Sequence, residues 1–245
     1  MADKTKFIEE LNAKYQPKGE YIVLGKGMLD GEVITEVDVN IPLKTINRHG
    51  LIAGATGTGK TKTLQVFVEQ LSHKGIPTLV MDIKGDLSGI AVEGEQNDKI
   101  NERYAKTKLP YQPQSFPVEL MTISAEKGLK LRATVTEFGP VLLSKILGLN
   151  DTQSSIMSIV FKYADDKGLP LIDLDDLKKT LQYVTDNDEG KKELASNYGA
   201  ISPASLGAIL RSIVALEQQG ATSFFGEPSF DVEDLLQTRG GKGVV

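Results

Sequence analysis

The stretch from residue 51 to residue 61 constrains the fold of this chain more than any other. It reads LIAGATGTGKT and matches the Gly-x-x-x-x-Gly-Lys-Thr pattern of a phosphate-binding loop. Glycine lets backbone N–H groups wrap a phosphate chain, because no Cβ stands in the way. Such N–H groups form an anion-binding nest at the start of a helix, where the helix dipole also favours negative charge. The motif therefore predicts a nucleotide site between a strand and a helix.

The sequence on both sides of the loop fits this interpretation. A short apolar run, residues 51–53, precedes the loop as a strand would. The helical pattern after it places Leu64, Phe67, Val68 and Leu71 at positions i, i+3, i+4 and i+7. A chance glycine-rich turn is the plainer alternative, but such a turn does not need a strand before it and an amphipathic helix after it.

The polar residues of the loop have predicted parts in binding ATP and Mg²⁺. Lys60 is expected to reach the β- and γ-phosphate oxygens, and the Thr61 hydroxyl is expected to bind Mg²⁺. The predicted nucleotide-binding residues are Gly54, Ala55, Thr56, Gly57, Thr58, Gly59, Lys60, Thr61 and Thr63.

A second strand is predicted at residues 78–83, which are nearly all apolar and β-prone. Together with residues 51–53 and the helix between them, it would form a right-handed βαβ unit. Asp82 lies at the carboxyl end of this strand, where open α/β sheets bind their ligands. We therefore assign Asp82 to catalysis together with Lys60, and to the metal site together with Thr61.

The polar loop after this strand, residues 84–89, leaves two interpretations open. It is either a tight turn with exposed charges, or a segment in which Asp82, Lys84 or Asp86 contacts Mg²⁺, water or a neighbouring subunit.

The chain divides into four predicted parts, which together indicate an α/β fold with a parallel-sheet core. Residues 1–50 form a short helix (residues 4–15) and a small β-element with a turn at Asp30 and Gly31. Residues 51–138 form part of the core, residues 139–237 form a helical insertion, and residues 238–245 begin another core strand. The other expected elements are a strand at 118–123, a β-extension at 129–133, and helices that begin near residue 141, at 151, at 174, at 202–203 and at 232.

Composition narrows the function classes. The chain has 245 residues and a net charge of −5, and it lacks a run of about 18 apolar residues that would span a membrane. The absence of cysteine excludes disulfides and thiolate metal sites, and two histidines do not indicate a His-rich metal centre. The charge does not indicate a nucleic-acid-binding monomer. It does not exclude DNA, because a ring-shaped motor can line its pore with a few basic loops.

One part of an ATP-hydrolysing site has no match in the sequence. ATP hydrolysis by proteins with this phosphate-binding loop needs a carboxylate on Mg²⁺ and usually a second carboxylate that positions water. Both carboxylates are typically carried by an apolar strand that ends in Asp-Glu. The nearest match, residues 79–82, lacks the Glu. The last residues, GGKGVV, read as a turn and the opening of an apolar strand. We therefore expect this chain to be the N-terminal part of a longer protein.

Four segments resemble one known family, the HerA-like, YjgR-type bacterial ATPases. They are residues 41–61 (IPLKTINRHGLIAGATGTGKT), 82–89 (DIKGDLSG), 147–153 (LGLNDTQ) and 224–228 (FFGEP), and the resemblance extends over roughly residues 20–245. It implies a RecA-like P-loop NTPase core of the HerA/FtsK motor group, a cytoplasmic location and a homo-oligomeric ring, commonly a hexamer. It also implies that the Asp-Glu strand and the arginine that completes a neighbour's site lie beyond residue 245.

Three functions remain as hypotheses. The first is an ATP-driven DNA translocase or helicase-like ATPase, with nucleotide, DNA and further copies of the chain as partners and no membrane. The second is a non-catalytic nucleotide-binding or assembly module. The third, a small-molecule kinase, would normally carry an arginine-rich lid over the phosphates, whereas arginine is sparse here and no lid cluster follows the loop.

Overall fold

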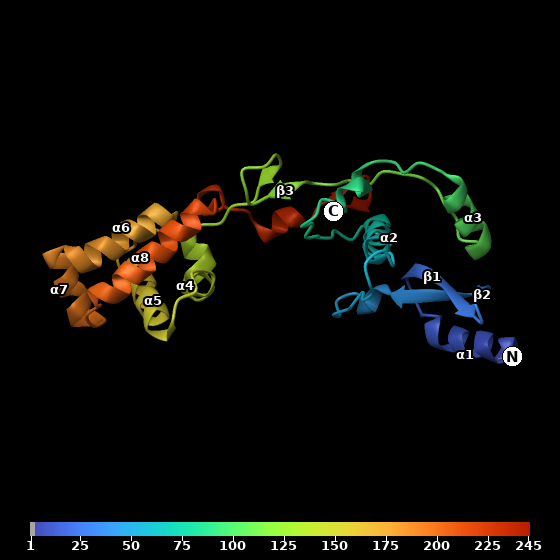
Figure 1. Ribbon diagram of the computed structural model, residues 1–245, viewed down its shortest axis with the longest axis horizontal. Helices are drawn as coiled ribbons and strands as arrows, with labels where there is room; N and C mark the ends of the chain where they lie inside the picture. The colour runs from blue at the N-terminus through green and yellow to red at the C-terminus, as the bar shows by residue number, and fades with distance from the viewer. Residues whose placement is uncertain (1–2) are drawn as a thin grey trace. The chain divides into compact units, whose positions relative to one another are not determined.

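The chain is a mixed α/β protein, and a computed structural model describes its residues 3–245 (Figure 1). It divides into two compact units. The first contains the residues up to Glu119 together with Val232–Val245, and the second contains Leu120–Asp231. The first unit is therefore built from two stretches of chain that are separate in sequence.

The N-terminal part of the first unit is a helix packed on a β-hairpin. Helix α1 (Lys4–Tyr15) is followed by the antiparallel strands β1 (Tyr21–Leu29) and β2 (Glu32–Pro42). Ile22, Ile34 and Val37 are buried, and Asp30 and Gly31 form the turn. The predicted helix, strands and turn are confirmed. A short 3₁₀ turn, Leu43–Thr45, follows.

Helix α2 (Lys60–His73) follows the glycine-rich loop, as predicted. Its Val68 packs with Ile90 and Phe116 in a small core. The segment after residue 83 contains a 3₁₀ turn, Ser88–Ala91, and helix α3 (Asp98–Thr107). Helix α2 thus presents its first turn to the loop and its later turns to the core.

The predicted strands on either side of α2 are not formed. Residues 51–53 and 78–83 have no regular secondary structure, and Leu51, Met81 and Ile83 are 89, 86 and 94% exposed. Each sheet within residues 3–245 has two strands, so the expected parallel-sheet core is absent from the described structure. The physical reason is that a parallel strand depends on ladder partners along its length and on cover over both faces, whereas Leu51, Met81 and Ile83 are exposed here.

The C-terminal residues nevertheless make strand-like contacts in the first unit. Strands β5 (Thr238–Arg239) and β6 (Lys242–Gly243) form a hairpin after a 3₁₀ turn at Val232–Leu235, where a short helix was expected. The Val245 N–H donates to Pro117 O at 3.0 Å, and Glu119 N–H donates to Val245 O at 2.8 Å. Thr78 N–H also donates to Val244 O at 3.0 Å. Residues 244–245 are therefore hydrogen-bonded to two segments at once, as an inner strand is.

The second unit is a helical bundle that covers its own core. Its helices are α4 (Val135–Ile146), α5 (Asp151–Asp166), α6 (Leu174–Asp186), α7 (Asp188–Asn197) and α8 (Pro203–Gln218). Met157, Leu177 and Ile209 are among its fully buried residues. The predicted starts at residues 151, 174 and 202–203 are confirmed. Helix α4 begins earlier than expected, and a kink at Gly139 separates its first turn from the predicted part.

Strands in this unit are short. The strand predicted at 118–123 is reduced to β3 (Met121–Thr122), which pairs in parallel with β4 (Leu129–Lys130). A 3₁₀ turn, Ala221–Ser223, follows α8, and Ala133 bridges to Phe225. The helices therefore supply nearly all the packing of the unit.

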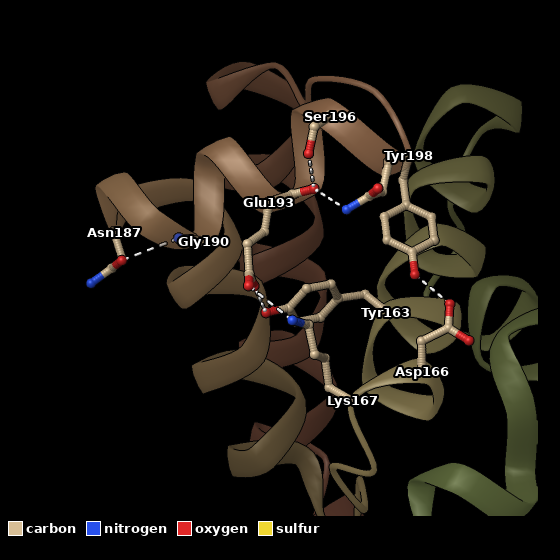
Figure 2. Close-up of polar contacts among 9 residues, drawn as sticks. Tyr163, Asp166, Lys167, Asn187, Gly190, Glu193, Ser196 and Tyr198 are labelled. Atoms are coloured by element: carbon tan, nitrogen blue, oxygen red, sulfur yellow. Dashed lines mark hydrogen bonds and ion pairs between the residues drawn. The ribbon is translucent and has the colours of Figure 1, made fainter.

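Polar contacts hold α7, which was not predicted, against α5 (Figure 2). Glu193 accepts a hydrogen bond from the Tyr163 hydroxyl at 2.9 Å and pairs with Lys167 at 2.8 Å. Tyr198 donates to Asp166. Burial and the Glu193 carboxylate raise the pKa of Tyr163 to about 12. Because Tyr163 stays protonated, it remains a donor at every physiological pH.

No helix within residues 3–245 combines the length and the apolar character needed to cross a membrane.

Candidate nucleotide site

The glycine-rich loop adopts a backbone that its glycines make accessible. Gly57 and Gly59 have φ values of 81° and 94°, a region that L-residues with a Cβ rarely adopt. A Cβ on Gly54 would lie 2.5 Å from the Thr58 hydroxyl oxygen. Geometry therefore favours glycine at Gly54 and Gly59, which belong to the sequence pattern, and at Gly57, a position that the pattern leaves open.

The loop closes around the carbonyl of Ala55. The Thr58 hydroxyl and the Lys60 ammonium each donate to Ala55 O at 2.8 Å. Thr56 is exposed in the turn between them. The Lys60 ammonium is thus folded back over the loop and held by a neutral carbonyl oxygen, which a charged phosphate oxygen can replace.

The first turn of α2 suits an anion. Gly59 is the N-cap, and no side chain within the described residues caps it. The first turn contains no acidic residue, so its free N–H groups and the helix dipole face no carboxylate of their own helix. Thr63 bonds back to Gly59 O through its N–H at 2.9 Å and its hydroxyl at 3.1 Å. Thr63 therefore stabilises this first turn.

A carboxylate lies beside the predicted metal-binding hydroxyl, and it belongs to Asp86. The Thr61 hydroxyl donates to Asp86 Oδ2 at 3.3 Å. Hydroxyl and carboxylate oxygens are the hard ligands that Mg²⁺ prefers, so the donor set fits this ion. It is a pair, since no group of three or more His, Cys, Asp or Glu side chains in the described chain is arranged around a metal position.

Asp82, which the sequence assigned to the metal, has a different set of partners. Its carboxylate accepts from the N–H groups of Gly85, Asp86 and Leu87 at 2.8, 3.2 and 2.9 Å. These backbone donors, Leu87 foremost, lower the pKa of Asp82. The Asp82 side chain therefore folds the segment that carries Asp86.

Sequence reasoning placed Asp86 among three candidates of the polar loop but did not select it. The available signal was its position four residues after Asp82 in a glycine-containing loop, which permits a turn back towards α2. Gln65 gave no such signal, yet its side chain is buried and donates from Nε2 to Asp86 O at 2.9 Å.

Comparison with known proteins agrees with the motif. The family model described as "Helicase HerA-like C-terminal" matches residues 29–245. "Probable helicase MJ1565" of Methanocaldococcus jannaschii is 35% identical over 78 residues, which cover 30% of this chain and 15% of that protein. The chain thus spans only a small part of this relative's length, and no solved structure matches. Because the family match includes most of the chain, this protein belongs to the family of helicase HerA-like C-terminal domains.

Proposed function

We propose that this chain binds ATP with Mg²⁺ as the nucleotide-binding part of a RecA-like, HerA/FtsK-type ATPase that drives DNA translocation. In this proposal the ATPase works as a homo-oligomeric ring, commonly a hexamer, in the cytoplasm. The observation that carries it is the arrangement at the start of α2, where an uncapped helix N-terminus, Lys60 and the Thr61–Asp86 pair adjoin one glycine-rich loop. Membership of the HerA-like family supports the choice of activity.

Each residue of the loop has a distinct role in this proposal. The backbone N–H groups of residues 55–60 bind phosphate oxygens, and Lys60 exchanges Ala55 O for a phosphate oxygen. Thr61 and Asp86 hold Mg²⁺ through their oxygens. The bound ion would offset phosphate charge. Asp82 belongs to the site as the side chain that folds the Asp86 segment.

Isothermal titration calorimetry with ATP and Mg²⁺ tests the binding step. Lys60→Ala should weaken ATP binding at least tenfold, because the displaced lysine makes a charge-assisted contact with phosphate. Lys74→Ala is the matched control, since Lys74 lies just beyond the far end of α2 and pairs with Glu20. Undetectable ATP binding by the unaltered chain would contradict the proposal.

A second candidate function is a nucleotide-binding or assembly module without turnover. It is favoured by the engagement of Asp82, the other carboxylate of this segment, whose oxygens accept from the backbone N–H groups of Gly85, Asp86 and Leu87. ATP binding without phosphate release, with or without duplex DNA, would support the module. DNA-stimulated phosphate release that Lys60→Ala abolishes would support the motor.

A further inference from the structure

Gln65 is a buried amide on the helix that starts the nucleotide site. Its residue is 7% exposed, and it shares the inner face of α2 with Val68 and Leu71. A buried amide costs free energy unless its polar atoms are hydrogen-bonded. Its partners therefore explain why a polar side chain occupies this position.

Both ends of the Gln65 amide are engaged, and the contacts fix its orientation. Lys62 Nζ donates to Gln65 Oε1 at 2.8 Å, and Gln65 Nε2 donates to Asp86 O at 2.9 Å. The reversed amide would place its NH₂ group against an ammonium group and its oxygen against a carbonyl oxygen. Gln65 therefore presents a donor specifically to Asp86.

Thr61 and Gln65 hold different groups of the same aspartate. The two residues are four apart on α2 and thus lie on one face of the helix. Thr61 contacts the Asp86 carboxylate, Gln65 contacts the Asp86 carbonyl, and Asp82 accepts from the Asp86 N–H. Three contacts consequently set the distance between the Asp86 carboxylate and the Thr61 hydroxyl.

We propose that Gln65 is a positioning residue that holds Asp86 in place for Mg²⁺ in the nucleotide complex. This inference rests on the proposed ATP and Mg²⁺ binding. Residues that orient a metal ligand through a hydrogen bond change metal affinity about 10- to 100-fold when they are replaced. Gln65 does not touch the nucleotide or the ion itself.

The test compares two glutamines of the same helix. Gln70 also exchanges hydrogen bonds with a backbone, accepting from Val23 N–H at 2.7 Å and donating to Val23 O, away from the Asp86 segment. Nucleotide affinity of the full chain is measured with ADP in EDTA. After the EDTA is removed by dialysis, Mg²⁺ is titrated into the ADP complex. Gln65→Met should weaken Mg²⁺ binding about tenfold and leave ADP affinity in EDTA unchanged. Gln70→Met should lower the melting temperature and leave Mg²⁺ binding as in the unaltered chain.

Two further variants, Asp86→Asn and Gln65→Glu, complete the test of the positioning role. Asp86→Asn should weaken Mg²⁺ binding at least as much as Gln65→Met. If Gln65→Met does not fold, Gln65→Glu replaces it, because Glu keeps the contact with Lys62 but loses the N–H donor. Unchanged Mg²⁺ affinity in the Gln65 or Asp86 variants, or an equal loss in Gln70→Met, would overturn the positioning role alone. Failure of the unaltered chain to bind ADP in either condition would overturn the proposed function as well.

Discussion

The two units of this protein bury their apolar residues to very different degrees. In Leu120–Asp231, the apolar faces of five helices meet in one core, and Met157, Leu177 and Ile209 are fully buried. In the first unit, the apolar segments at residues 51–53 and 78–83 remain largely exposed around the nucleotide loop. A helix satisfies its backbone internally and needs cover on one face, whereas a parallel strand needs partners and cover on both faces. The difference teaches that the proposed site lies in the unit whose packing is less complete.

Truncating one apolar side chain in each unit should give the largest difference in lost unfolding free energy. Leu177→Ala should lower the free energy of unfolding by about 2–5 kcal/mol, because it leaves a cavity among fully buried side chains. Met81→Ala should cost less than about 0.5 kcal/mol, since that side chain is 86% exposed. Urea unfolding followed by circular dichroism measures both. An equal loss would show that residues 78–83 are covered in solution and would break the comparison.

Replacing one glycine in each unit should give a smaller difference in unfolding free energy, and this difference sharpens the comparison between the two units. Gly139 has φ 77° and ψ 161°, a region almost confined to glycine, so Gly139→Ala should cost about 1–3 kcal/mol of unfolding free energy. Gly59→Ala should cost about 1 kcal/mol, since φ 94° and ψ 19° lie nearer the left-handed helical region.

The two glycine variants differ in a second readout. Only Gly59→Ala should also weaken ATP binding, because Gly59 is the N-cap of α2. Thermal melts and calorimetry separate the two effects. Equal ATP affinity for Gly59→Ala and the unaltered chain would argue against a phosphate position at this cap.

The smallest expected effect is the loss of the Asp82 contribution to stability at low pH. Its pKa is lowered below the ordinary 3.8 by backbone donors, so its contribution to stability is present above pH 3.8 and is lost as pH falls below that value through the lowered pKa. The Leu87 amide signal in ¹⁵N NMR should therefore shift below pH 3.8, and Asp82→Asn should remove that transition. A shift centred well above pH 3.8 would show that the backbone donors do not stabilise the Asp82 carboxylate.

Some secondary-structure elements of this protein can be predicted from the sequence, and others cannot. Helix α8 follows from Ser202, Pro203 and a regular apolar face, because helical signals are local. The loop at Gly57 and Gly59 is equally local. Helix α7 was not predicted, because Leu194 is the only buried apolar side chain in this helix and a single N-cap residue, Asn187, is a weak helix signal.

Long-range contacts explain what the sequence did not predict at the site. The contact of Asp86 with Thr61 depends on how the loop after residue 83 folds back onto α2. The role of Gln65 depends on the same fold, since a buried glutamine has no spacing pattern. The strand predicted at residues 78–83 was wrong, because forming a strand depends on partners that an apolar, β-prone composition does not specify.

The discontinuous first unit has a consequence for the order in which the chain acquires structure. Ser72 donates to Gly243 O across 171 positions of sequence, and Val245 bonds to Pro117 and Glu119. All residues of the second unit leave the ribosome before Val232–Val245 do. Its helices close mainly local contacts, which form fast, whereas the first unit must wait for its last fourteen residues. On the ribosome, the nucleotide loop therefore emerges long before the segment that hydrogen-bonds to helix α2.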